Sequence, residues 1–81
     1  MKDRNNEIQV LASFAKNKLC PHFFKWRNRK YTISSVDLIK KYDQDDARMY
    51  CFAAITTEGS YHITFNNKTF QWVLIDFNKK N

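Results

Sequence analysis

Polar and apolar residues alternate along most of the chain from residue 23 to residue 77, and this period of two is typical of β-strands. The alternation is cleanest over Ser60–Phe65. There we expect Tyr61, Ile63 and Phe65 to point inward and His62 and Thr64 to point outward. Over Arg48–Thr56 both faces are apolar, as in a strand at the centre of a packed sheet. The pattern therefore predicts an all-β protein.

Short polar stretches interrupt the alternation, so the chain divides into about six strands joined by turns. The expected strands cover Ile8–Phe14, His22–Arg27, Lys30–Tyr42, Arg48–Thr56, Ser60–Phe65 and Thr69–Phe77. The expected turns are Ala15–Lys18, Asn28-Arg29, Asp43–Asp46, Glu58-Gly59 and Asn66-Asn67. Residues 1–7 and 78–81 are expected to be polar tails on a single β domain over residues 8–77. Ile8–Phe14 also fits a helical stripe; we favour a strand because the segments that follow it are β in character.

Four positions carry expectations about the backbone. Pro21 has no N–H and suits an edge position or the start of a strand. Asn28 tolerates the positive φ that a type I′ hairpin turn requires at both central residues. Gly59 is the single glycine of the sequence and is expected where φ is positive. The apolar positions slip from odd to even numbers near Ser34-Ser35, which predicts a bulge or bend there.

A chain of 81 residues has room for one core, because two cores would each fall near the size of about 40 residues below which disulfides, metals or partners are usually needed. Six twisted antiparallel strands with bulky apolar side chains on both faces curl up rather than lie flat. We therefore predict a single domain, an antiparallel meander curled into a small SH3-like or partly open barrel. The alternative is a homodimer that covers the second apolar face, with strand exchange at the edge strand near residues 8–14.

The formal net charge is +6, from 14 basic and 8 acidic residues. The excess lies near the N-terminus, where residues 1–30 carry eight basic and two acidic side chains. Such a field favours acidic partners such as nucleic acid, although basic residues also serve solubility alone. No apolar run approaches the roughly 20 residues that a membrane span needs, and none follows the N-terminus as in a signal peptide. We expect a cytoplasmic protein without membrane contact, in which Cys20 and Cys51 are reduced.

One hairpin carries a family resemblance, over the residues Pro21-x-x-Phe24-x-Trp26-Arg27-x-Arg29-x-Tyr31-x-Ile33. This stretch resembles small uncharacterised bacterial β-domains with the pattern P-x-x-F-x-W-R-G-R-x-Y-x-V. Asn28 stands here where that pattern has glycine. The resemblance implies an all-β domain whose first strand precedes the Trp26 strand. It brings no established activity, although an association of such domains with error-prone DNA polymerase systems slightly favours nucleic-acid binding.

Residues able to carry chemistry form no recognisable active site. The soft metal ligands are Cys20, His22, Cys51 and His62. Their spacing departs from the C-x₂₋₄-C and H-x₃₋₅-H pairs of structural zinc sites, so we expect no metal and no cofactor. The acidic run Asp43–Asp46 lacks the glycine and terminal glutamate of an EF-hand loop. There is no P-loop, no dinucleotide fingerprint and no element to supply an oxyanion hole, so we do not expect an enzyme.

The most distinctive surface feature is a basic hairpin, the stretch Lys25–Tyr31, which sets four cations among aromatic residues. The candidate contact residues are Lys25, Arg27, Arg29, Lys30 and Tyr31, with Lys16 and Lys18 as further cations. Cations give salt-dependent affinity for phosphates, and aromatic rings offer stacking surfaces for bases. The plainer alternative, which the alternation favours, is that Phe24 and Trp26 point inward and leave an ordinary solvated face.

Two classes of function fit these observations. The favoured one is a small non-enzymatic interaction or structural module whose partner is an unknown protein or a second copy of the chain. Aromatic and arginine side chains dominate interface energetics, and an open sheet edge can accept a partner strand. The other is low-specificity binding of single-stranded DNA or RNA through the basic hairpin.

Overall fold

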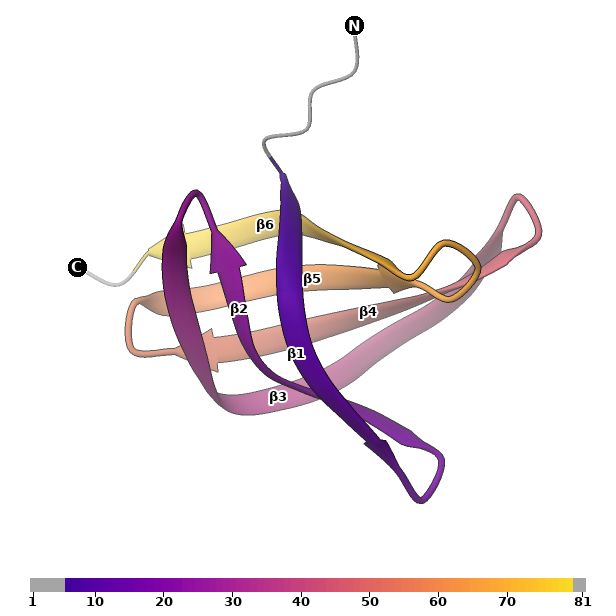
Figure 1. The fold of residues 1–81 in the computed structure, drawn as a ribbon, viewed down its shortest axis with the longest axis horizontal. Helices are drawn as coiled ribbons and strands as arrows, with labels where there is room; N and C mark the ends of the chain where they lie inside the picture. The colour runs from indigo at the N-terminus through magenta and orange to yellow at the C-terminus, as the bar shows by residue number, and fades with distance from the viewer. Residues whose placement is uncertain (1–5, 80–81) are drawn as a thin grey trace, which may run out of the picture.

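The computed structural model describes residues 6–79 and contains six antiparallel strands that close into a barrel in the order of the sequence (Figure 1). The strands are β1 (Glu7–Ala15), β2 (Lys18–Trp26), β3 (Arg29–Gln44), β4 (Ala47–Thr56), β5 (Gly59–Asn66) and β6 (Gln71–Lys79). The predicted all-β, single-domain, six-stranded meander is therefore confirmed. Ile8–Phe14 is strand rather than helix. The described part of the chain holds no helix of the length and apolarity that crossing a membrane requires.

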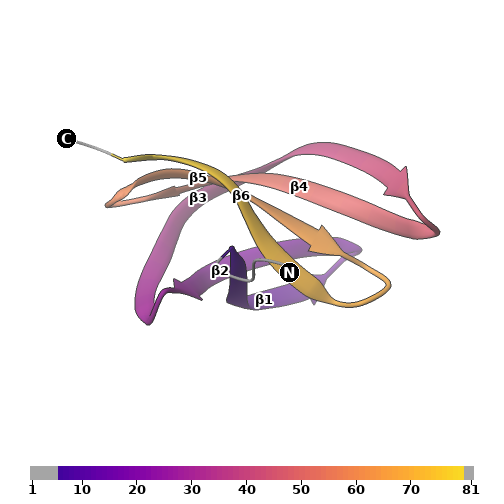
Figure 2. The ribbon, with the colours of Figure 1, turned by 90° about the horizontal axis from the view of Figure 1, so that it is seen from above.

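The barrel is flattened, with extents of 39 × 38 × 18 Å, and consists of two layers (Figure 2). One layer holds β1, β2 and the first residues of β3; the other holds the remainder of β3 with β4, β5 and β6. Strand β3 runs from one layer into the other. It has an extra residue at Ser34, because Ile33 lies opposite Thr56 while Ser35 lies opposite Ile55. The predicted bulge at Ser34-Ser35 is confirmed, and it provides the bend that β3 needs.

The core is built from the inward residues of both layers. Its buried members are Ile8, Phe24, Trp26, Tyr31, Phe52, Tyr61, Ile63, Trp72 and Leu74. The Phe24 ring stacks on Tyr31 at a centroid distance of 5.0 Å and meets Tyr61 edge-on at 5.4 Å. Full burial of such a side chain contributes roughly 1.5–3 kcal/mol. Phe24 and Trp26 thus point inward, as the plainer alternative for the basic hairpin predicts.

Thr64 is an exception to the simple alternation. It lies on the face opposite Ile63, as expected, yet its side chain is only 3% exposed. Cys51 sits opposite Thr64 on the neighbouring strand, with its Sγ 3.5 Å from the threonine Oγ1. Cys51 and Val73, its neighbours on the two adjacent strands, flank this short side chain on the outer face.

Three hairpins turn through two residues that both have positive φ, as type I′ turns do. These pairs are Lys16-Asn17, Arg27-Asn28 and Asp45-Asp46. The expectation that Asn28-Arg29 forms the central pair was wrong by one position. Asn17 and Asn28 both occupy the second central position, and Arg29 instead begins β3 opposite Trp26.

Other boundaries also differ from the expectations; for example, β2 begins at Lys18 and β3 extends to Gln44. The turn before β5 is Thr57-Glu58, and Gly59 is the first residue of that strand, with the positive φ (141°) that was predicted. The loop before β6 runs over residues 67–70, so Thr69 and Phe70 are loop rather than strand. Glu7 belongs to β1 because it pairs with Val73 on the last strand, and β6 extends to Lys79 because Lys79 pairs with Gly59 on β5. Of the expected tails 1–7 and 78–81, residues 1–5 and 80–81 lie outside the described residues.

Candidate functional site: an aromatic cleft at the open end of the barrel

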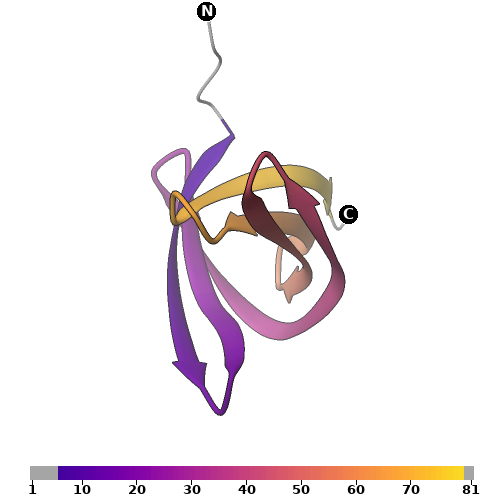
Figure 3. The ribbon, with the colours of Figure 1, turned by 90° about the vertical axis from the view of Figure 1, so that its right-hand side faces the viewer.

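The sheet divides where β2 and β3 separate. The two strands pair over four positions beside the Arg27-Asn28 turn, from Trp26 opposite Arg29 to Phe23 opposite Thr32. Beyond these positions β2 continues on β1 alone, and β3 continues on β4 alone, in the described part of the chain. The β1–β2 and β3–β4 hairpins therefore splay apart at the far end of the barrel (Figures 1 and 3).

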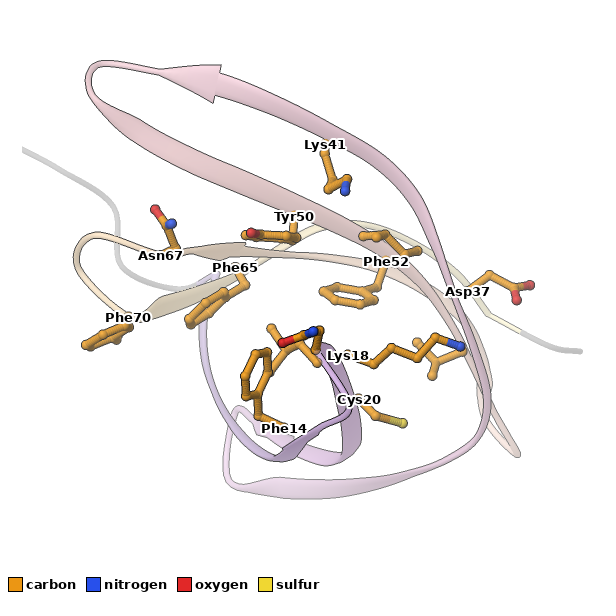
Figure 4. Close-up of a pocket in the computed structure, with 14 residues that line it drawn as sticks. Phe14, Lys18, Cys20, Asp37, Lys41, Tyr50, Phe52, Phe65, Asn67 and Phe70 are labelled. Carbon is orange, nitrogen blue, oxygen red and sulfur yellow. The ribbon is translucent and has the colours of Figure 1, made fainter.

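A cleft of about 720 Å³ occupies this open end (Figure 4). It is lined mainly by apolar and aromatic residues from five of the strands and from the β5–β6 loop. The apolar members are Phe14, Leu19, Val36, Leu38, Tyr50, Phe52, Phe65 and Phe70. The charged members are Lys18, Lys41 and Asp37. A cleft of this size with an apolar lining and few charges is typical of a binding site.

Large apolar side chains at this cleft are unusually exposed. Phe14 is 71% exposed, Phe70 is 73% exposed and Leu38 is 46% exposed. They come from β1, the β5–β6 loop and β3, so the fold gathers them from distant parts of the sequence. Exposed apolar side chains that gather in one place mark contact surfaces, whereas isolated ones are ordinary.

The backbone at Phe70 is strained. Its φ is 62°, in the left-handed region that bulky residues avoid. Asn66 holds the loop in this shape, because its Oδ1 accepts hydrogen bonds from the backbone N–H of Lys68 at 2.8 Å and of Thr69 at 3.1 Å. The Phe70 N–H donates to the Asn66 carbonyl at 2.7 Å. A strained residue whose side chain remains in solvent gains little from folding, so this geometry points to a role in binding.

The β5–β6 loop is also tied to the β3–β4 hairpin. The Arg48 N–H donates to Asn67 Oδ1 at 2.8 Å, and the Asn67 N–H donates to the Arg48 carbonyl at 3.1 Å. The Arg48 guanidinium in turn donates to Asp43 at 2.6 Å, and this bond raises the pKa of Arg48. These contacts hold one wall of the cleft to another and keep Phe70 at its mouth.

The four cations of the basic hairpin lie at the closed end and are all exposed. Arg27 lies over the Trp26 ring at 4.5 Å, and Lys30 lies over the Phe23 ring at 4.2 Å. Arg29 pairs with Glu58 at 3.0 Å. The cationic groups of Arg27 and Lys30 thus lie over aromatic rings while their side chains remain exposed.

The structure divides the predicted set of contact residues. Lys25, Arg27, Arg29 and Lys30 are brought together, but Tyr31 is buried in the core and cannot stack on a base or a partner. We therefore remove it from the set. Lys16 and Lys18 lie at the opposite end of β2, and the latter lines the cleft.

The soft ligand residues are not assembled into a site. The Nε2 atom of His22 lies 2.8 Å from the Oγ atom of Ser13. The Nδ1 atom of His62 lies 4.0 Å from the Oδ2 atom of Asp76. Cys20 and Cys51 are free, half-buried thiols. Among residues 6–79, histidine, cysteine and acidic side chains nowhere come together in a group of three that could hold a metal ion. Asp43 and Asp46 instead take part in ion pairs.

Comparison with known proteins gives no relative: no family model matches the chain, and no match was found among the curated proteins or the solved structures. The resemblance of the hairpin to small bacterial β-domains stays a prediction.

Sequence reasoning missed the cleft. Two local signals, Pro21 and the slip at Ser34-Ser35, lie next to the point where β2 and β3 separate, but neither of them shows that the two hairpins splay apart. A signal did exist for Phe70. Asn66 followed by polar residues is a typical start of a side-chain-capped turn, and it places Phe70 at the end of a loop rather than in a strand.

Proposed function

We propose that this protein is a non-enzymatic protein-interaction module whose contact surface is the aromatic cleft. The observation that carries the proposal is Phe70, a bulky residue held in a left-handed conformation with its ring in solvent. The strained backbone of such a residue destabilises the free protein, and burial of its ring by a partner contributes favourable binding free energy.

Burial on a partner explains how the cleft would bind. Phe14, Leu38 and Phe70 are exposed in the free protein, and burying one such side chain is worth roughly 1.5–3 kcal/mol. Aromatic anchors of this kind carry most of the affinity of interfaces. Lys18 and Lys41 at the same cleft add selectivity for a partner of opposite charge.

The test is affinity capture from an extract of the native cells, treated with nuclease, followed by reconstitution of each captured protein with purified components. The cleft variant carries Phe14→Ala and Phe70→Asn. The matched control carries Leu11→Ala and Ile75→Ala, because these residues are also exposed and apolar but do not line the cleft. We expect the cleft variant to lose at least about tenfold in affinity and the control to bind as wild type. Equal binding by the two variants would contradict the proposal.

A second candidate function is binding of single-stranded nucleic acid at the basic hairpin. The supporting observation is that Lys25 lies directly opposite Lys30 on the neighbouring strand. Like charges in such a pair repel, so an anion placed between them is favoured. Arg27 lies at the turn beside them.

This candidate makes a prediction of its own. Affinity for a single-stranded oligonucleotide should fall steeply as salt rises, and it should fall further in a variant with Lys25→Glu and Lys30→Glu. Lys16→Glu with Lys68→Glu is the matched charge control, since these cations lie at the other end of the barrel. Undetectable binding at low salt, or equal losses in both variants, would remove this candidate.

A further inference from the structure

Two walls of the cleft are strand edges without a partner strand in the described part of the molecule. On one side is Lys18–His22 of β2, which pairs with β1 alone. On the other side is Ile33–Gln44 of β3, which pairs with β4 alone. An unpaired edge presents a row of N–H and C=O groups that an added strand can satisfy. Figure 1 shows the two strands diverging on either side of this opening.

We propose that the cleft binds an extended segment of a partner protein as an added strand that pairs with β3. This inference rests on the proposed function, because it specifies the form in which the partner enters the cleft. An extended backbone satisfies the open edge and at the same time delivers side chains to the apolar lining, which a helix or a folded surface does not.

The β3 edge is the better template of the two. Pro21 removes one N–H from β2, and the extra residue His22 makes that strand irregular, because Leu11 lies opposite Phe23 while Ala12 lies opposite Pro21. In β3 the stretch Ser35–Leu38 is regular and lies between the bulges at Ser34 and Ile39. A short added strand therefore fits opposite this stretch.

Alternation fixes the chemistry of the inner positions. Every second side chain of the added strand faces the cleft, where Val36 and Leu38 already project from β3. Leu19 and Phe52 line the same cleft. These apolar side chains offer no partner for a charge, so the side chains of the segment that face Val36 and Leu38 are apolar. Phe14 and Phe70 at the mouth then cover its ends.

Charge selects the positions of the segment that lie beyond Val36 and Leu38. Lys18 on β2 and Lys41 on β3 border the cleft, against the single carboxylate Asp37 (Figure 4). The chain as a whole carries +6, so a second copy would be repelled. The segment that fits carries apolar residues against Val36 and Leu38 and acidic residues toward Lys18 and Lys41.

The experiment uses the full chain and a phage-displayed library of random peptides of about six residues. We expect enriched peptides to combine apolar residues with acidic residues. A synthetic copy of an enriched peptide should slow hydrogen exchange of amides in Ser35–Leu38 by about tenfold or more. Methylating those backbone nitrogens of the peptide that face β3 should lower affinity by a similar factor.

A charge exchange provides the matched control. Lys18→Glu with Lys41→Glu should abolish binding of the acidic peptide, and a peptide with lysine in place of its acidic residues should restore it. Restoration cannot come from a variant that fails to fold.

Other outcomes overturn the inference and separate it from the proposed function. Peptides that need Phe14 and Phe70 but leave the Ser35–Leu38 amides unprotected would refute strand addition and leave the interaction module standing. Peptides that lose affinity on Lys25→Glu and Lys30→Glu, but not on Phe70→Asn, would refute both. Saturable binding of oleate at the cleft without any enriched peptide would refute both as well and identify a site for an anionic lipid.

Discussion

The ring of Phe70 stacks on the ring of Phe65, with ring centroids 6.0 Å apart and an interplanar angle of 14°. Phe65 in turn lies 4.8 Å from Trp72, which belongs to the core. The exposed aromatic at the mouth of the cleft is thus the outermost ring of a stack that begins inside the barrel. A partner that binds Phe70 therefore contacts a ring that is stacked, through Phe65, onto the core.

The first prediction separates stability from binding at this residue. Phe70→Asn loses the ring contact, worth about 0.5–1.5 kcal/mol, but relieves a left-handed backbone strain of about 1–2 kcal/mol. We expect the free energy of unfolding in urea to stay the same or rise by up to about 1 kcal/mol, while partner affinity falls. A clear loss of stability would show that the residue serves the fold rather than a partner.

The second prediction concerns two adjacent phenylalanines with opposite orientations. Phe24 is fully buried, whereas Phe23 lies on the outer face beneath Lys30. We expect Phe24→Ala to lower the free energy of unfolding by about 3–5 kcal/mol and Phe23→Ala to lower it by no more than about 1 kcal/mol. Urea denaturation of both variants measures the difference. Similar losses would mean that the register of β2 is wrong.

The third prediction concerns two residues with positive φ, one at the start of a strand and one in a turn. Gly59 has φ of 141°, a region that a Cβ makes unfavourable, so Gly59→Ala should cost on the order of 1–3 kcal/mol. Asn28 has φ of 63°, which glycine adopts freely, so Asn28→Gly should change stability by less than about 1 kcal/mol. Thermal unfolding compares the two. Tolerance of alanine at position 59 would contradict the turn assigned before β5.

The fourth prediction concerns alkaline pH. Burial raises the pKa of the Tyr61 phenol above its ordinary value of 10.0, and the neighbouring Tyr31 adds to the shift. Because the folded state holds the proton more tightly than the unfolded state, this contribution to stability is complete below pH 10.0 and is lost as the pH rises through the raised value. Urea denaturation of Tyr61→Phe should therefore show a shallower decline in this range than wild type. Tyr42→Phe, a change outside the core, should follow wild type; identical declines in all three proteins would exclude the effect.

Much of the fold could be predicted from the sequence, because strand pairing in a meander is local. The inward positions Tyr61 and Ile63 follow from alternation, and the bulge at Ser34 follows from the slip of the apolar positions. The error at Asn28-Arg29 came from placing asparagine first in the turn, whereas the second central position is the one it takes here. Type I′ geometry requires positive φ at both positions, and the sequence alone did not specify which residue pair adopts it.

The candidate site could be predicted only in part. The cations of the basic hairpin are neighbours in the sequence, so their clustering could be predicted from their positions along the chain. The cleft joins residues as distant as Phe14 and Phe70, and it exists because β2 and β3 part after four pairs. The two strands part beside Pro21 and the Ser34 bulge, but these features predict an edge and a bend and do not specify a cleft between the two hairpins.

The most direct test of the account is to map the surface that a captured partner covers. Nuclear magnetic resonance of the isotope-labelled full chain, titrated with the purified partner, reports which backbone amides change. We predict that the shifts concentrate at Phe14, Ser35–Leu38 and Phe70 and leave the Lys25–Lys30 hairpin unchanged. Shifts confined to that hairpin, with an unchanged cleft, would contradict the assignment of the cleft as the contact surface.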